Sequence, residues 1–304
     1  MIDGLNFSGQ KFNHQKNAEQ TNTFFCDNSV LSEKINDLIW AYNDVGDVIP
    51  QYSGKFGSGH KLPYSESFFE LECSYQLLKL SFYKYAFIAL RNALELGLLS
   101  VYWDRNDDAE KIIKEWHNSN EDTPFKRQIL NGLLCVDNIK EFCKHYDIID
   151  RAKNIYGDLS DFAHTKGYSF SSHNLNNANF TKFNQNVVFN WTVQLENVVQ
   201  LLLILHVLKY PVALQNTPLE QKFGINIPYG GFLDIYQSDR IKAILNPEEL
   251  KILQQISNKD ENAKVLFEWV NSHPDISDKE FKKQLLDFDK DVEKINSAYN
   301  DKTK

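Results

Sequence analysis

Residues 183–209 carry apolar side chains nearly all the way round a helix. One side of this helix carries Val187, Val188, Trp191, Leu195, Val198, Leu202 and Leu205. Another side carries Val199 and Leu203. A helix that is apolar on every side must be surrounded by other elements. Its most apolar part, Val198–Leu208, is too short to cross a bilayer and contains His206. We therefore expect the central helix of a bundle rather than a membrane span.

Most of the remaining chain also has a helical pattern. Residues 66–103 lack proline, and their apolar residues recur at intervals of three and four, which predicts one long helix or two joined by a kink near Leu80–Tyr83. Period-two alternation is scarce, so we expect an all-α fold, a helical bundle with a smaller C-terminal helical subdomain. Other helices are expected at 28–42, 108–116, 124–135, 137–145, 147–163, 236–245, 247–257, 261–271 and 278–296.

The chain divides by composition into three parts. Residues 1–27 are polar and irregular and predict a loosely packed N-terminal arm, residues 28–214 the main helical bundle, and residues 215–304 the C-terminal subdomain. A net charge of −8 argues against broad, salt-driven coating of nucleic acid. The N-terminus lacks the basic start and apolar block of a signal peptide. We expect a cytoplasmic protein with no membrane partner.

Cofactor and metal motifs are absent from the sequence. The four cysteines show no CxxC spacing and predict free, mostly buried thiols. There is no HExxH, no glycine-rich phosphate loop and no EF-hand loop. We expect no cofactor and no metal site.

Arg91 and Glu95 stand four residues apart in an apolar helix. Charged side chains on the apolar face of a helix must be paired and hydrogen-bonded. This favours an Arg91–Glu95 pair that also holds a neighbouring helix in place. The alternative is that Arg91 presents its guanidinium to an anion beside His164.

A second polar group ends the helix expected at 147–163. Tyr156 and Ser160 precede His164 by two turns and one turn. A histidine at a helix C-terminus is favoured electrostatically without any catalytic role. We expect Arg91, Glu95 and His164 to form one structural polar focus between two adjacent helices, with Gly167 as the left-handed terminator of the second.

Basic residues gather in the middle of the chain. If they faced one groove they could hold RNA or single-stranded DNA, although a solvated charged surface is the more common outcome. The candidates for nucleic-acid binding are Lys126, Arg127, Arg151, Lys153 and Lys166.

Several blocks of the sequence resemble an uncharacterised family of bacterial helical proteins. They are YKYAFIALRNALELGLLSVYWDRN, EDTPFKRQIL, YGDLSDFAHTKG, NIPYGGFLDIYQSDRIKAIL and SHPDIS, within residues 65–290. More distantly, an arginine on one helix and LS…H at the end of another resemble HEPN domains of bacterial toxin and anti-phage systems. Many HEPN domains cut RNA with an arginine four to six residues before a histidine, and this chain has no such pair.

The resemblance and the residues together favour a non-catalytic interaction or regulatory protein of a bacterial defence or stress module. Its partner would be another protein or a second copy of the chain. The alternative is a metal-independent ribonuclease acting on RNA. In that case His164 would be the general acid or base and Arg91 would stabilise the phosphate, with Tyr156 or Ser160 assisting.

Overall fold

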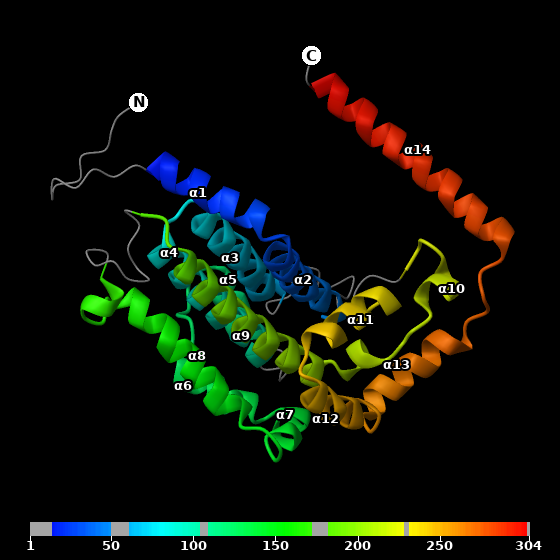
Figure 1. Ribbon diagram of the computed structural model, residues 1–304. Helices are drawn as coiled ribbons and strands as arrows, with labels where there is room; N and C mark the ends of the chain where they lie inside the picture. The colour runs from blue at the N-terminus through cyan, green and yellow to red at the C-terminus, as the bar shows by residue number, and fades with distance from the viewer. Residues whose placement is uncertain (1–13, 50–60, 104–108, 172–181, 228–230, 303–304) are drawn as a thin grey trace.

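The computed structural model describes residues 14–49, 61–103, 109–171, 182–227 and 231–302, and within them every regular element is a helix (Figure 1). The all-α prediction is confirmed. The first half contains α1 (His14–Asp27), α2 (Ser29–Val45), η1 (Gly46–Val48), α3 (Lys61–Lys79), α4 (Tyr83–Trp103), α5 (Ala109–His117), α6 (Lys126–Leu133) and α7 (Asp137–Phe142). The second half contains α8 (Ile148–Ala163), η2 (Tyr168–Phe170), α9 (Gln185–Lys209), η3 (Pro211–Leu214), α10 (Leu219–Phe223), α11 (Ile235–Ile244), α12 (Pro247–Ser257), α13 (Glu261–Ser272) and α14 (Asp278–Lys302).

Helix α9 is the centre of the bundle, as its apolar surface predicts. It packs against α2, α4, α7, α8 and α12. Its length and composition would suffice to cross a membrane, but most of it is buried by the other helices. Its His206 is fully buried against the rings of Tyr42 and Tyr64, with ring centroids 6.2 and 5.5 Å away. The apolar surface of α9 is therefore the protein's own core.

Helices α3 and α4 form a tightly packed hairpin, so the expected kink is a complete break. Ser81 takes a left-handed conformation at φ +63°, and the Phe82 N–H donates to the carbonyl of Leu77. This bond pattern ends a helix and reverses the chain. The Ser81 hydroxyl is buried and lies 2.9 Å from the Thr21 hydroxyl of α1. A bond to a neighbouring helix thus supports the turn.

Helix α1 corrects the expectation of an irregular arm over residues 1–27. Residues 14–27 are helical, and the remaining residues 1–13 lie outside the described ranges. The helix buries Asn17, Thr21 and Phe25 on one face. Two of these three residues are polar, so the buried face lacks the apolar periodicity from which a helix is predicted.

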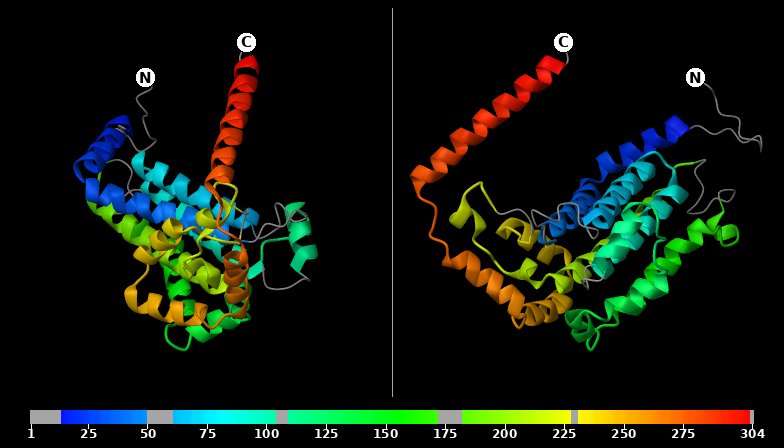
Figure 2. Two further views of the ribbon diagram at one scale, coloured as in Figure 1. Left: turned by 90° about the vertical axis from the view of Figure 1, so that its right-hand side faces the viewer. Right: turned by 180° about the vertical axis from the view of Figure 1, so that it is seen from behind.

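The domain boundary expected at residue 215 stays a prediction, and helices on its two sides pack together. The core extends without interruption to Ile241 of α11 and to Leu253 and Ile256 of α12. Helix α11 packs on α2, and α12 packs on α7 and α9. The composition changes at 215 because a loop-rich segment follows, but the helices after it complete the main core. Helix α14 stands away from the bundle (Figures 1 and 2).

Candidate functional site

The interface between α4 and α8 brings the predicted polar residues together. The apolar stripe of α8 is buried, and its Phe162 stacks on Phe87 of α4 with ring centroids 4.0 Å apart. That contact fixes how the two helices align. It leaves Tyr156 and Ser160, on the flank of α8, beside Arg91 and Glu95 of α4.

Arg91 is the hub of this cluster. Its Nε donates to the Ser160 hydroxyl at 3.1 Å, and its Nη2 donates to Glu95 at 3.3 Å and to the Tyr156 hydroxyl. The Tyr156 hydroxyl in turn donates to Glu95 at 2.7 Å. The Arg91 side chain is 19% exposed and that of Glu95 is 37% exposed. The expected pair exists, but it is half-buried rather than fully buried.

The environment of Tyr156 keeps its hydroxyl protonated. Burial raises the pKa of Tyr156, and its hydrogen bond to Glu95 raises that pKa further, while Arg91 acts in the opposite direction. A protonated phenol donates to Glu95, as the geometry requires. The Lys126 ammonium lies over the same ring, 4.0 Å from its centroid, and the Arg91 guanidinium lies 4.8 Å from it. Tyr156 thus connects the cluster to α6.

His164 lies outside this cluster, which corrects the predicted polar focus of Arg91, Glu95 and His164. It caps the C-terminus of α8 and is exposed, and no hydrogen bond or ion pair joins it to Arg91 among the described residues. The left-handed residue after it is Thr165 at φ +50°, whereas Gly167, at φ +70°, follows two residues later. Helix α8 therefore ends at Ala163, as predicted, but the left-handed residue after its end is Thr165 rather than Gly167, and His164 is exposed.

A cleft of about 610 Å³ opens next to the cluster, between α3, α4, α6 and α8. Leu99 and Ile129 provide buried apolar surface in it, and Phe125 stands at its edge with 81% of its surface exposed. Tyr156 and Glu95 line it from the side of the cluster. The cleft combines an apolar surface with a few polar groups, which is the usual composition of a binding site.

Glu70 is an acidic residue that lines this cleft. Burial raises the pKa of Glu70, while a hydrogen bond from Asn92 at 3.5 Å lowers it and the negative charge of Glu66 raises it. Neither Glu70, Asn92 nor Phe125 was singled out in the sequence. Glu70 lies four residues after Glu66 in an otherwise apolar segment, and this was the one available signal.

Three of the five predicted nucleic-acid residues are paired with acidic side chains. Arg151 pairs with Glu249 at 3.0 Å, Lys153 with Asp150 at 2.6 Å, and Lys166 with Asp161 at 3.0 Å. Lys126 is half-buried over Tyr156, and Arg127 is exposed at the cleft. Three of the five cations are therefore matched by carboxylates, which weakens the local field that would attract phosphates.

Metal and thiol chemistry find little support in the described part of the chain. No group of three or more acidic, histidine or cysteine side chains there is placed to hold a metal ion. All four cysteines are free, as predicted, but Cys26 and Cys135 are exposed and Cys73 and Cys143 are half-buried. The expectation of mostly buried thiols was wrong.

Comparison with known proteins returns no match to a family model, to a curated protein or to a solved structure.

Proposed function

We propose that this protein is a non-catalytic interaction protein that holds a partner's polypeptide segment in the cleft between α3, α4, α6 and α8. On the basis of the sequence resemblance we assign it to a bacterial defence or stress module, and we keep the cytoplasmic location expected from the composition of the sequence. The observation that carries the proposal is the cleft itself, with Phe125 exposed at its edge over the buried Leu99 and Ile129.

The polar groups around the cleft suit binding better than catalysis. Arg91 is held by acceptors of its own chain, and Tyr156 donates to Glu95. A group that stabilises charge in a reaction must point at the reacting atoms. These groups point at one another, so they serve to shape one wall of the cleft.

The proposal is tested by panning a random-peptide display library on the purified protein and measuring the enriched peptides by fluorescence anisotropy. Phe125→Ala should weaken their binding by about 10- to 100-fold, because burying a phenylalanine contributes about 1.5–3 kcal/mol. Tyr236→Ala is the matched control, since Tyr236 is 73% exposed on α11 and does not line the cleft. No enriched peptide, or equal losses in the two variants, would contradict the proposal.

A ribonuclease is the second candidate, favoured by the convergence of Arg91, Tyr156 and Ser160 at one interface. Purified protein is incubated with total RNA and with tRNA, alongside His164→Ala and Arg91→Ala. Cleavage that both substitutions abolish would replace the interaction function with this one. Identical products from all three proteins would exclude it.

A further inference from the structure

Helix α14 leaves the body of the protein after a firmly held first turn. Ser277 and Glu280 form a capping box at its start, with the Glu280 N–H 3.3 Å from the Ser277 hydroxyl and the Ser277 N–H 3.1 Å from the Glu280 carboxylate. Gln284 bonds to the end of α10 and to the loop after it: it donates to the carbonyl of Phe223 and accepts from the N–H of Ile225, each at 3.0 Å. Beyond Gln284 no described helix packs extensively along α14 (Figures 1 and 2).

The projecting helix carries an exposed apolar seam. Phe281, Leu285, Phe288 and Val292 follow one another at intervals of four, three and four residues, and the sequence continues the interval at Ile295 and Tyr299. An interval alternating between three and four is the heptad pattern of a coiled coil. The first four of these side chains are between 38% and 58% exposed. A seam of this kind needs a helix to cover it.

The charged residues beside the seam indicate which helix could cover it. Lys282 and Asp289 occupy the same flank of the heptad, seven residues apart, and are exposed. Within the described part of the chain neither has an ion-pair partner, whereas Asp287 pairs with Lys290 and Asp291 pairs with Lys294. In an antiparallel pair of identical helices, residues on this flank face each other. When Leu285 lies opposite Phe288 of the second copy, Lys282 of each chain lies opposite Asp289 of the other.

The same alignment also matches side-chain sizes. Phe281 then faces Val292 of the second copy, and Leu285 faces Phe288, so each of these layers joins a ring to a smaller side chain, which favours close packing. A parallel pair would instead place Phe281 on Phe281 and Phe288 on Phe288, and it would give Lys282 no acidic partner. Only the antiparallel arrangement satisfies both the charges and the sizes.

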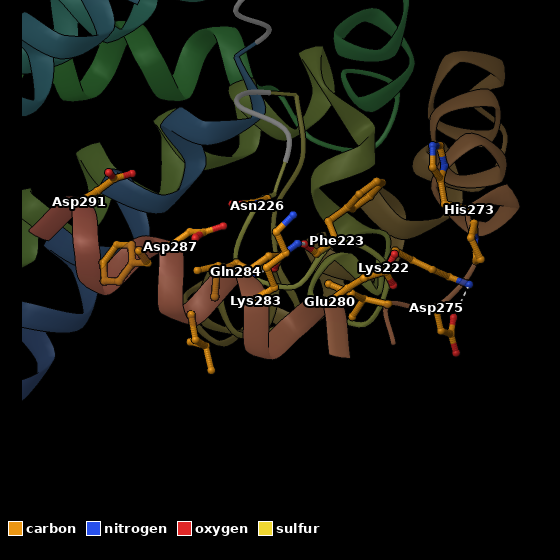
Figure 3. Close-up of a pocket in the computed structure, with 15 residues that line it drawn as sticks. Lys222, Phe223, Asn226, His273, Asp275, Glu280, Lys283, Gln284, Asp287 and Asp291 are labelled. Carbon is orange, nitrogen blue, oxygen red and sulfur yellow. Dashed lines mark hydrogen bonds and ion pairs between the residues drawn. The ribbon is translucent and has the colours of Figure 1, made fainter. Parts of the chain in front are cut away.

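The groove beside the seam offers room for the second helix. It has a volume of about 930 Å³ and runs between α14 and the end of α10, with Leu285, Phe288 and Asp291 on one side and Phe223 and Asn226 on the other (Figure 3). This volume corresponds to about two turns of α-helix. A helix lying along the seam would therefore contact the groove as well.

From these observations we infer that α14 is a self-association element, and that two copies of this chain pair through antiparallel α14 helices. The inference does not depend on the cleft between α3, α4, α6 and α8. The partner is a second copy because the charge pattern of α14 is complementary to itself when it is reversed.

The test is size-exclusion chromatography with light scattering of the full chain over a series of concentrations, because the fraction of dimer falls as the protein is diluted. The wild type should reach twice the chain mass of 35.4 kDa. Phe288→Lys should give a monomer at every concentration. Leu286→Lys is the matched control: Leu286 is as exposed, at 60% against 58%, but lies off the seam, so this variant should remain a dimer.

Charge reversal tests the orientation of the two helices. Lys282→Asp and Asp289→Lys should each raise the dissociation constant severalfold, since each places two like charges opposite each other, and the double variant should restore the wild-type value. Far-UV circular dichroism checks that each variant is folded. A wild type that stays monomeric, equal effects of Phe288→Lys and Leu286→Lys, or a dimer that does not respond to the charge reversals would overturn the inference.

Discussion

Two glycines in the middle of helices provide a direct test of how closely α4 packs on α9. Gly97 of α4 is buried, and a Cβ atom added there would lie 2.7 Å from the methyl groups of Leu202 and 2.8 Å from the Tyr42 hydroxyl. Gly157 of α8 is exposed, and an added Cβ atom would have no neighbour within 4 Å. The same substitution therefore meets a filled space at one site and open space at the other.

The expected magnitudes follow from two opposing effects. Replacing glycine by alanine inside a helix stabilises it by about 1 kcal/mol, and this gain applies at both sites. At Gly97 the contacts would be about 1 Å shorter than the optimal separation of carbon atoms, and overpacking of this kind costs about 1–3 kcal/mol. We expect Gly157→Ala to stabilise the protein by about 1 kcal/mol and Gly97→Ala to destabilise it by about 1 kcal/mol.

Urea unfolding of the two variants and the wild type, followed by tryptophan fluorescence, measures the difference. Trp191 is fully buried on α9 and stacks on Tyr75, so its fluorescence reports on the core concerned. Because the backbone effect is common to both variants, the separation of about 2 kcal/mol between them isolates the cost of packing. If Gly97→Ala proved as stable as Gly157→Ala, the close approach of α4 to α9 would be refuted.

Three further predictions concern the site and its surroundings. Arg91→Ala should destabilise the protein by about 1–2 kcal/mol in urea unfolding. This is less than the roughly 3 kcal/mol expected for a fully buried pair, because the Glu95 carboxylate left behind can be hydrated. The control Arg127→Ala, at an exposed arginine, should not change the free energy of unfolding. Burial raises the pKa of Glu70 from 4.5, so the wild type should lose stability relative to Glu70→Gln as the pH rises from 4.5 through the raised pKa. The melting temperatures of the two proteins should therefore diverge across that pH range and keep a constant difference above it. Thr165→Gly should raise the free energy of unfolding by about 1 kcal/mol, because glycine adopts the left-handed conformation without strain, and an unchanged thermal melt would show that this residue is not strained.

Apolar periodicity predicted the helices whose buried faces are apolar. It located α9 as the central helix, the break between α3 and α4, and most of the later helices to within a few residues. It missed α1, because Asn17 and Thr21 occupy that helix's buried face and bond within the protein. The boundary predicted at residue 215 rests on composition, which reports the loop there and not how the helices that follow pack.

The candidate site was predictable only as far as it depends on single helices. The spacing of Arg91 and Glu95 predicts their pair, and Tyr156 and Ser160 recur at one turn on the neighbouring helix. The end of α8 at Ala163 was predicted, but the left-handed residue after it is Thr165 and not the expected glycine, and the side on which His164 lies relative to Arg91 does not follow from the pattern of one helix. The cleft depends on four helices at once, and Phe125 contributes to it because α6 begins beside α8, which no local pattern records. Which side chains of different helices come together therefore depends on where the helices end and how they pack. Functional tests are best directed at residues such as Phe125, whose exposure the packing of the core does not explain.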